Sequence, residues 1–321
     1  MKLIRSLLVL LFFALLHVSA MAQQWPSKPV RWLIPYPPGG SAEILARPIA
    51  QKLTELWGQP VVLDFRPGAG GTIATEAVAK AAPDGHTIIV VLAAHAINES
   101  LYSRLPYDTL RDFAPVTLAA SLPLIVVTPP SLPANSIKEL IALGKAKPGS
   151  LNFASAGNGN TSHLAGELFK NTAGIQMEHV PYKGSGPAVI ALLAGEVSLM
   201  FDSISSSLAQ IKAGKLKALA VTSAKRSHAM PQLPTVAESG LPDFIVDGWY
   251  GILAPAGTPP AIINKMNADI VRAMQAPEVR ERITGFGYDI IGSTPEQFST
   301  HLRSEVERWS KVVKASGARV D

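Results

Sequence analysis

Residues 30–56 read VRWLIPYPPGGSAEILARPIAQKLTEL. The short apolar run at 30–34 predicts a β-strand, and a turn rich in proline and glycine follows it at 35–40. From Ser41 onward the apolar residues recur at helical spacing, and serine is a residue type that caps helices. A strand, a glycine turn and an amphipathic helix in direct succession are typical of α/β proteins.

The same alternation of short apolar runs and helical patterns continues to the end of the chain. Thr258-Pro259 predicts a helix start, and Thr294-Pro295-Glu296-Gln297 predicts another with a capping box. Several runs are apolar on both faces, which is typical of parallel strands covered by helices on both sides. We predict an α/β fold with strands at residues 30–34, 61–63, 87–92, 124–127, 151–154, 197–201, 216–221 and 250–253.

Two stretches rich in proline divide the chain, one at 128–133 and one at 233–243. At roughly 100–200 residues per domain, a chain of 321 residues is long enough for two lobes. We predict that residues 23–127 and 249–321 form the first lobe and that residues 128–248 form the second. Each lobe would be a mostly parallel sheet flanked by helices, and the two chain crossings would form the hinge of a clamshell.

The first 22 residues predict a secretory signal peptide. Lys2 and Arg5 form a basic start, residues 7–18 are an apolar run, and Ala20-Met21-Ala22 is a cleavage site of small residues. The apolar run is shorter than the roughly 20 residues that a membrane-spanning helix needs. We therefore expect cleavage after Ala22 and export to a compartment such as the bacterial periplasm.

The composition excludes several classes of protein. The chain has no cysteine, which rules out disulfides, thiolate metal sites and a cysteine nucleophile. Without Lys2 and Arg5, the 29 basic residues fall to 27 against 24 acidic ones, a formal charge of +3. That charge is too small to indicate a nucleic-acid-binding protein. With 47% hydrophobic and 17% charged residues, the chain is expected to be globular.

Common enzyme motifs are missing from the sequence. G-x-S-x-G, G-x-x-x-x-G-K-[ST], G-x-G-x-x-G and H-E-x-x-H do not occur, and the seven histidines are never at metal-ligand spacing. We therefore expect no enzyme, no cofactor and no metal. The alternative is a periplasmic hydrolase whose Ser, His and Asp lie far apart in the sequence.

Three loops of small residues precede predicted helices: PGGS at 38–41, PGAGGT at 67–72 and SAGNGNT at 155–161. The first N–H groups of a helix lack intrahelical partners and carry partial positive charge, so such loops bind anions. Because these loops lie at the carboxyl ends of strands, two facing lobes would enclose a small anion. The loops contain no Lys or Arg, which makes a carboxylate at least as good a candidate as a phosphate. The other interpretation is that the glycines only permit tight turns.

Side chains next to these loops are candidate ligand contacts. Tyr36 and Tyr182 precede glycine turns and would wall a cleft, unless they only pack at strand ends. His163 lies in the first turn of a predicted helix, where it would donate to a carboxylate or serve as a buried structural histidine. Asp202 follows the predicted strand at 197–201 and would bind a ligand amino or hydroxyl group, or cap the next helix.

One short motif occurs twice. Residues 34–40 read IPYPPGG and residues 180–186 read VPYKGSG, each a strand end followed by Pro-Tyr and a glycine turn into a helix. This repeated motif favours two lobes of similar fold. The alternative is two unrelated turns that both use proline and glycine.

Taken in order, the motifs of this chain resemble those of the tripartite tricarboxylate transporter receptor family, also called Bug proteins. They are YPPGGS at 36–41 with AR at 46–47, RPGAGG at 66–71, PDG at 83–85, N-x-x-LY at 98–102, GNG at 157–159 with HLAGELF at 163–169, VPYKG at 180–184, MFD at 200–202 and APAGTP at 254–259. The resemblance covers essentially the whole mature chain.

The resemblance implies a periplasmic solute-binding protein of the two-lobed, type II clamshell class. Such a protein captures a small carboxylate by lobe closure and does not turn it over. Dicarboxylates, tricarboxylates, acidic amino acids and aromatic carboxylates all remain candidate ligands. The resemblance also implies a membrane partner, either a tripartite transporter subunit or a sensor kinase. We expect a monomer with no nucleic-acid partner.

The resemblance further implies which residues hold the ligand. The first-lobe contacts would be Tyr36, Pro38, Gly39, Gly40, Ser41, Ala69 and Gly70. The second-lobe contacts would be Ser155, Gly157, Asn158, Thr161, His163 and Asp202. Two positions depart from the family pattern, because Glu43 and Phe65 stand where the family usually has Asp and Asn. These departures leave the shape of the pocket and the identity of the carboxylate open.

Overall fold

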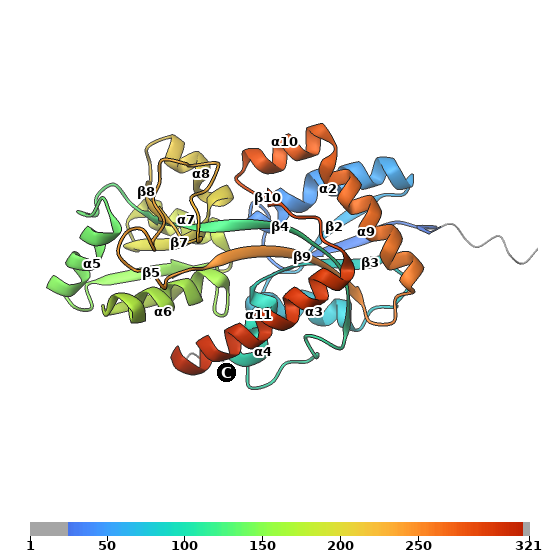
Figure 1. The fold of residues 1–321 in the computed structure, drawn as a ribbon, viewed down its shortest axis with the longest axis horizontal. Helices are drawn as coiled ribbons and strands as arrows, with labels where there is room; N and C mark the ends of the chain where they lie inside the picture. Colours follow the sequence, from blue (N-terminus) through green and yellow to red (C-terminus); the bar gives the residue numbers. More distant parts are fainter. Residues whose placement is uncertain (1–24, 317–321) are drawn as a thin grey trace, which may run out of the picture.

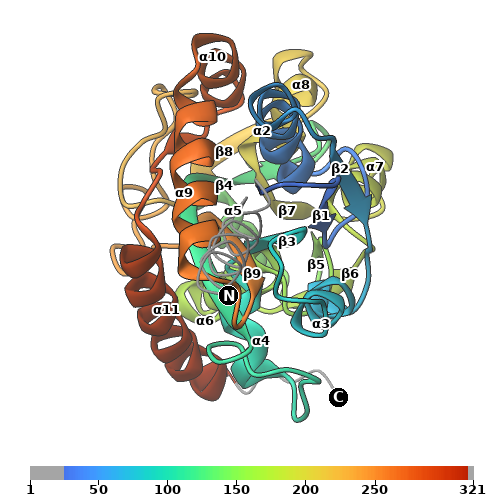
Figure 2. The ribbon, with the colours of Figure 1, turned by 90° about the vertical axis from the view of Figure 1, so that its right-hand side faces the viewer.

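The computed structural model of the chain describes residues 25–316. The predicted signal peptide at 1–22 and its cleavage site lie outside the described residues. Within them, ten strands form one mixed sheet with an apolar core layer on each face, covered by helices (Figures 1 and 2). The predicted α/β class is confirmed. No helix between residues 25 and 316 combines the length and apolar character needed to cross a bilayer.

One half of the molecule contains three parallel strands in the order β2-β1-β3, which antiparallel β9 joins to β4. Its elements, apart from β4 and β9, are β1 (Val30–Ile34), α2 (Ser41–Trp57), β2 (Val61–Phe65), η2 (Ala69–Gly71), α3 (Thr72–Ala79), β3 (Thr87–Leu92), α4 (Ala94–Leu101), α9 (Pro260–Gln275), α10 (Pro277–Gly285), β10 (Asp289–Ile290) and α11 (Pro295–Ser316). Helices α9 and α11 pack against β4, so both ends of the described chain build this half (Figure 2).

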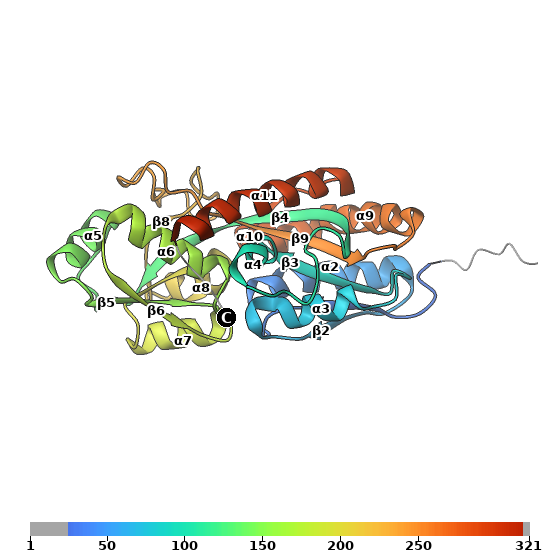
Figure 3. The ribbon, with the colours of Figure 1, turned by 90° about the horizontal axis from the view of Figure 1, so that it is seen from below.

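The other half has the same core arrangement of three parallel strands, here in the order β7-β5-β6, while β7 and β8 pair antiparallel with β4. Its elements are α5 (Ile137–Ala146), β5 (Leu151–Ser155), α6 (Thr161–Ala173), β6 (Met177–Pro181), α7 (Ser185–Ala194), β7 (Leu199–Ser203), α8 (Ile204–Lys212) and β8 (Lys217–Val221). Figures 1 and 3 show this half on the left, beyond the long strands β4 and β9.

Strand β4 (Phe113–Thr128) passes from one half to the other. It pairs with β9 (Asp247–Pro255) from Phe113 to Pro123, and with β7 and β8 from Leu124 to Thr128. The strands predicted at 124–127 and 250–253 are therefore parts of longer strands. Pro115 interrupts the apolar pattern of β4, and the ladder shifts register next to it. The predicted lobe boundaries, after residues 127 and 248, stay a prediction.

Helix starts differ slightly from the predictions. Gly40, not Ser41, is the N-cap of α2, because Ser41 is already the buried first residue of the helix. Helix α9 begins at Pro260, one residue later than Thr258-Pro259 predicted. The capping box of α11 is confirmed: the N–H of Thr294 donates to Gln297 Oε1 at 3.0 Å, and the N–H of Gln297 donates to Thr294 Oγ1 at 3.2 Å.

Candidate functional site

Loops from the two halves of the molecule approach each other closely. A Cβ added to Gly184, just before α7, would lie 2.8 Å from Cδ of Pro37 in the loop after β1. A Cβ added to Gly70, in the loop after β2, would lie 2.8 Å from the carbonyl oxygen of Asn158 after β5. Backbones can approach this closely only where a side chain is missing. The glycine loops identified in the sequence, and both copies of the Pro-Tyr motif, therefore come together in one place.

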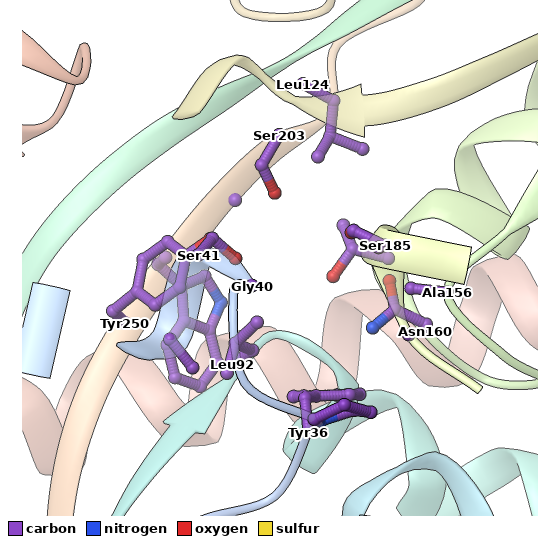
Figure 4. Close-up of a pocket in the computed structure, with 17 residues that line it drawn as sticks. Tyr36, Gly40, Ser41, Leu92, Leu124, Ala156, Asn160, Ser185, Ser203 and Tyr250 are labelled. Carbon is purple, nitrogen blue, oxygen red and sulfur yellow. The ribbon is translucent and has the colours of Figure 1, made fainter. Parts of the chain in front are cut away.

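A first pocket lies where the two halves face each other. Figure 4 shows Tyr36, Gly40 and Ser41 of one half across from Asn160 and Ser185 of the other. The empty space, including the part open to solvent, is about 540 Å³. Residues of both halves line this space, so a molecule bound in it would contact both halves.

Four helices begin at the wall of this pocket. The N-cap residues of α2, α6, α7 and α8 all line it, and they are Gly40, Asn160, Gly184 and Ser203. Helix N-termini present free N–H groups and partial positive charge. None of the described residues that line the pocket is Asp, Glu, Lys or Arg. The pocket therefore offers an anion neutral hydrogen-bond donors and helix dipoles rather than a charged side chain.

A second pocket adjoins the first. Both pockets have Tyr36, Pro37 and Ala156 in their walls. The remaining lining residues of the second pocket are 67–71, Tyr102, Gly157, Asn158 and 181–183. Lys183 is the one charged residue in the described part of this lining. A ligand longer than the first pocket would extend past Tyr36 toward this lysine.

Tyr36 stands at the boundary of the two pockets. Its hydroxyl donates to the carbonyl oxygen of Gly70 at 3.4 Å. Burial raises the pKa of Tyr36 well above its usual value, although a hydrogen bond with Asn160 opposes the shift. The phenol is therefore protonated at neutral pH and acts as a hydrogen-bond donor.

Asp202 lies at the end of β7, directly before the lining residue Ser203. It is buried, and its Oδ2 accepts a hydrogen bond of 2.6 Å from the Ser207 hydroxyl. Oδ1 makes no hydrogen bond with any residue that the structure describes. Burial raises the pKa of Asp202 to about 6 even though Ser207 and Ser185 lower it. Asp202 does not itself line either pocket.

Glu43 reaches back to the loop before its own helix. Its Oε2 accepts the backbone N–H of Gly39 at 2.6 Å, and its Oε1 pairs with the Arg47 guanidinium. Glu43 thus fixes the loop at 38–41 from outside the pockets and occupies the N–H of Gly39. At the other departure from the family pattern, Phe65 ends β2 and packs against the apolar core.

Ser155, the first residue of the loop at 155–161, forms a cluster with His163 and His179. Ser155 Oγ lies 2.6 Å from Nε2 of His179, and the rings of His179 and His163 are stacked with centroids 3.9 Å apart. Ser155 has no exposed surface, and neither Ser155 nor His179 lines either pocket, so this pair is packed inside the protein. The described residues contain no group of three or more His, Asp or Glu side chains able to hold a metal ion.

The predicted contact residues fall into three groups. Tyr36, Gly40, Ser41 and Thr161 line the first pocket; Tyr36, Ala69, Gly70, Gly157 and Asn158 line the second; Pro38, Gly39, Ser155, His163 and Asp202 line neither. Which of these residues touch a ligand stays a prediction.

Several lining residues were not among the predicted contacts. Asn160 and Ser185 lie inside the glycine-rich motifs, which is a signal sufficient to find them. Trp249 and Tyr250 line the first pocket from β9, more than 200 residues after Tyr36 in the sequence. Nothing in their local sequence indicates a pocket, because only the sheet brings β9 beside β3 and β4.

Residues 45–318 match the family described as "Tripartite tricarboxylate transporter family receptor". The chain belongs to this family. The resemblance of the sequence motifs to this receptor family is thereby confirmed. As a receptor family, it is defined by substrate binding rather than by catalysis.

Several known proteins are similar to this chain along almost its whole length. Protein BugT of Bordetella pertussis is 39% identical over 325 aligned positions covering 100% of both chains. The solved structure of R. palustris Rpa4515 with adipate is 36% identical, with a TM-score of 0.89, and covers 92% of this chain and 100% of that one. MatC from Rhodopseudomonas palustris with bound malate is 34% identical, with a TM-score of 0.86, over 90% of this chain and 100% of that one. These likenesses confirm the predicted two-lobed clamshell.

Proposed function

We propose that this chain is a periplasmic receptor that binds a small carboxylate between its two lobes and presents it, unchanged, to a membrane partner. The observation that carries the proposal is the first pocket, where four helices from both halves begin around a space without charged side chains. A carboxylate would satisfy the free N–H groups at these helix starts.

A carboxylate fits this pocket better than a phosphate. Phosphates are commonly held by Arg or Lys, and the described lining of the first pocket contains neither. The adipate of Rpa4515 and the malate of MatC are both dicarboxylates, and both proteins share the fold of this chain. We propose a dicarboxylate as the first class to test, with tricarboxylates, acidic amino acids and aromatic carboxylates after it.

Ligand binding would be coupled to lobe closure. In the proposed division, residues 23–127 and 249–321 move as one lobe and residues 128–248 as the other, with β4 and β9 as the two crossing strands. Contacts from both halves surround the pocket, so a ligand would favour the closed arrangement over an open one. The closed surface would then be recognised by the transporter's membrane subunit, or by a sensor kinase as the second candidate partner.

Location and assembly follow from the same proposal. We propose export to the periplasm through the predicted signal peptide at 1–22, in agreement with membership of a transporter receptor family. We also propose that the receptor acts as a monomer, because one chain supplies both walls of the pocket.

A thermal-shift screen of residues 23–321 tests the proposed function. The panel contains adipate, malate, citrate, glutamate, benzoate, phosphate and glucose. A ligand at 100 times its Kd adds about 2.7 kcal/mol to the free energy of unfolding, which moves the midpoint by a few degrees. We expect shifts for one or more carboxylates only.

Two outcomes of the screen would contradict the proposal. One is a shift with phosphate or glucose and none with any carboxylate. The other is no shift at all, together with mass spectrometry of the denatured protein that finds no copurified small acid.

A further inference from the structure

Two histidines lie stacked beneath the loop at 155–161. His163 comes from the first turn of α6 and His179 from β6, and their ring planes differ by only 16°. On its other side, the His179 ring stacks on Phe153 of β5, with centroids 4.9 Å apart. His163 lines neither pocket, although the loop above it lines both. The pair is therefore a packed support for the loop.

Each histidine holds one point of the loop through a ring nitrogen. Nδ1 of His163 accepts the backbone N–H of Gly159 at 3.2 Å. Nε2 of His179 lies 2.6 Å from the hydroxyl of Ser155, and that hydroxyl also donates to the carbonyl oxygen of Gly157 and accepts its N–H, both at 3.2 Å. The hydrogen bonds thus run from the two rings to the start and the middle of the loop.

The loop needs such a support because of its glycines. Gly157 has a φ of +129° and Gly159 a φ of +74°, conformations that other residues rarely adopt. Glycine also samples many other conformations, so a glycine loop has no fixed shape of its own. The residues around these glycines wall the pockets: Asn158 in the second and Asn160 in the first. Fixing the glycines therefore fixes the pocket walls.

The charge state of the rings suits this role. Burial lowers the pKa of His163, although the Glu167 carboxylate opposes the shift. Burial, the neighbouring His163 and Lys170 lower the pKa of His179 to about 3. Glu167 and Lys170 pair with each other at 2.8 Å. Both rings are therefore neutral at neutral pH, which leaves Nδ1 of His163 free to accept a hydrogen bond.

We infer that His163 and His179 are positioning residues, whose stacked rings hold the 155–161 loop in the shape that walls both pockets without touching the ligand. The expected effect of these two histidines on ligand binding rests on the proposed function. Their effect on the loop can be measured without any ligand.

The test compares two variants of His163. His163→Phe keeps a ring for stacking and loses the acceptor for Gly159, whereas the side-chain oxygen of His163→Asn can accept that N–H in place of Nδ1. In amide hydrogen exchange of the ligand-free protein, we expect the Gly159 N–H to exchange about tenfold faster in the Phe variant. The Asn variant should exchange at nearly the wild-type rate. The Kd for adipate or malate should follow the same order.

A second pair of variants separates positioning from general stability. His179→Phe keeps the stack and loses the contact with Ser155, so it should also weaken carboxylate binding. His95 is the matched control, because it is buried, stacks on Tyr107 and lies outside both pockets. His95→Phe should leave Gly159 exchange and the Kd unchanged, whatever it does to the unfolding midpoint.

Two results would overturn the inference. The first is unchanged Gly159 exchange in His163→Phe. The second is equal loss of carboxylate binding in His163→Phe and His163→Asn although Gly159 exchanges faster only in His163→Phe, which would make His163 a direct ligand contact. If the wild-type protein binds no carboxylate of the screening panel, the proposed function is at fault, and Gly159 exchange still decides the role of the histidines.

Discussion

Gly40 is the lining residue whose replacement tests the first pocket most simply. Its φ of −83° suits any residue, and a Cβ there would lie 3.6 Å from the carbonyl oxygen of Pro37, an ordinary contact. Gly40→Val should therefore fold while placing methyl groups in the pocket. We expect ligand binding to weaken by about 1–3 kcal/mol, the usual cost of overpacking. Isothermal titration with the carboxylate identified by thermal shift measures this loss.

The control for this prediction is Gly285→Val. Gly285 ends α10 and lines neither pocket, and no atom lies within 4 Å of the position that a Cβ would take there. The affinity of this variant for the carboxylate should equal that of the wild type. Unchanged affinity in Gly40→Val, or an equal loss in both variants, would show that the loop at 38–41 does not wall the binding site.

Asp202 makes the stability of the protein depend on pH. Burial raises its pKa to about 6, although the neighbouring Ser207 and Ser185 oppose the shift. An aspartate in the unfolded chain ionises near pH 4, so the folded protein binds this proton more tightly than the unfolded one. Asp202 therefore stabilises the folded protein below about pH 4, and this contribution to the free energy of unfolding is lost as the pH rises through about 6.

Asp202→Asn should remove this dependence. A difference of about two pKa units corresponds to about 3 kcal/mol, so the variant should gain up to that amount over the wild type at pH 8 and little at pH 4. Urea unfolding at the two pH values measures the difference. Asp243→Asn, at an exposed aspartate of the same half, should match the wild type at both. A constant difference between Asp202→Asn and the wild type across this range would refute the prediction.

Some residues of the candidate site were predictable from the sequence and others were not. Tyr36 and the glycine loops were identified because proline and glycine mark turns wherever they occur. The sequence does not predict that Ser155 and His163 are buried behind the pockets rather than lining them. Ser155 ends a strand and His163 lies in a first helical turn, and in either place the packing of other elements decides whether a side chain faces a pocket or the core. His163 packs against His179, sixteen residues along the chain and on another element.

At the scale of elements, α11 depends on the capping box at its start. Thr294→Ala removes the acceptor of the Gln297 N–H, and we expect the free energy of unfolding to fall by about 1 kcal/mol. The helix packs on β4 and α4, so loosening its first turn affects the whole fold. Urea unfolding measures the change.

Thr300→Ala is the control within the same helix. The Thr300 hydroxyl donates only within α11, to the carbonyl oxygen of Glu296 on the exposed side. Its removal should change the free energy of unfolding by less than about 0.5 kcal/mol. Equal effects at Thr294 and Thr300 would mean that the capping box adds nothing to stability.

Elements were predictable where their signals are local. The run at 30–34, the helix after it and the capping box of α11 each carry their signal within a few residues, and all three are present. Strand β4 was predicted only at 124–127, because Pro115 and Pro123 break the pattern that identifies a strand. The partner β9 holds this part of β4 in the sheet, and it follows more than 100 residues later.

At the scale of the whole molecule, we predict that the proposed closure of the two lobes depends on Gly184. A side chain at Gly184 would collide with Pro37 of the other half, which lies 2.8 Å from the position of a Cβ. In small-angle X-ray scattering, we expect the wild type to become more compact when the carboxylate is added. Gly184→Leu should not, because the added side chain keeps the lobes apart.

Gly195→Leu is the matched control for closure. Gly195 also has a positive φ, so both substitutions strain the backbone, but no atom lies within 4 Å of a Cβ at Gly195. This variant should become compact with ligand as the wild type does. Ligand-dependent compaction of Gly184→Leu would contradict the prediction that closure requires the close approach of Gly184 and Pro37.

The most direct test of the whole account is a crystal structure of residues 23–321 with the carboxylate that stabilises it most. We predict the ligand in the first pocket, with carboxylate oxygens about 2.7–3.2 Å from backbone N–H groups at the starts of α2, α6 or α7. A ligand outside both pockets, or one held chiefly by Lys or Arg side chains, would contradict the account.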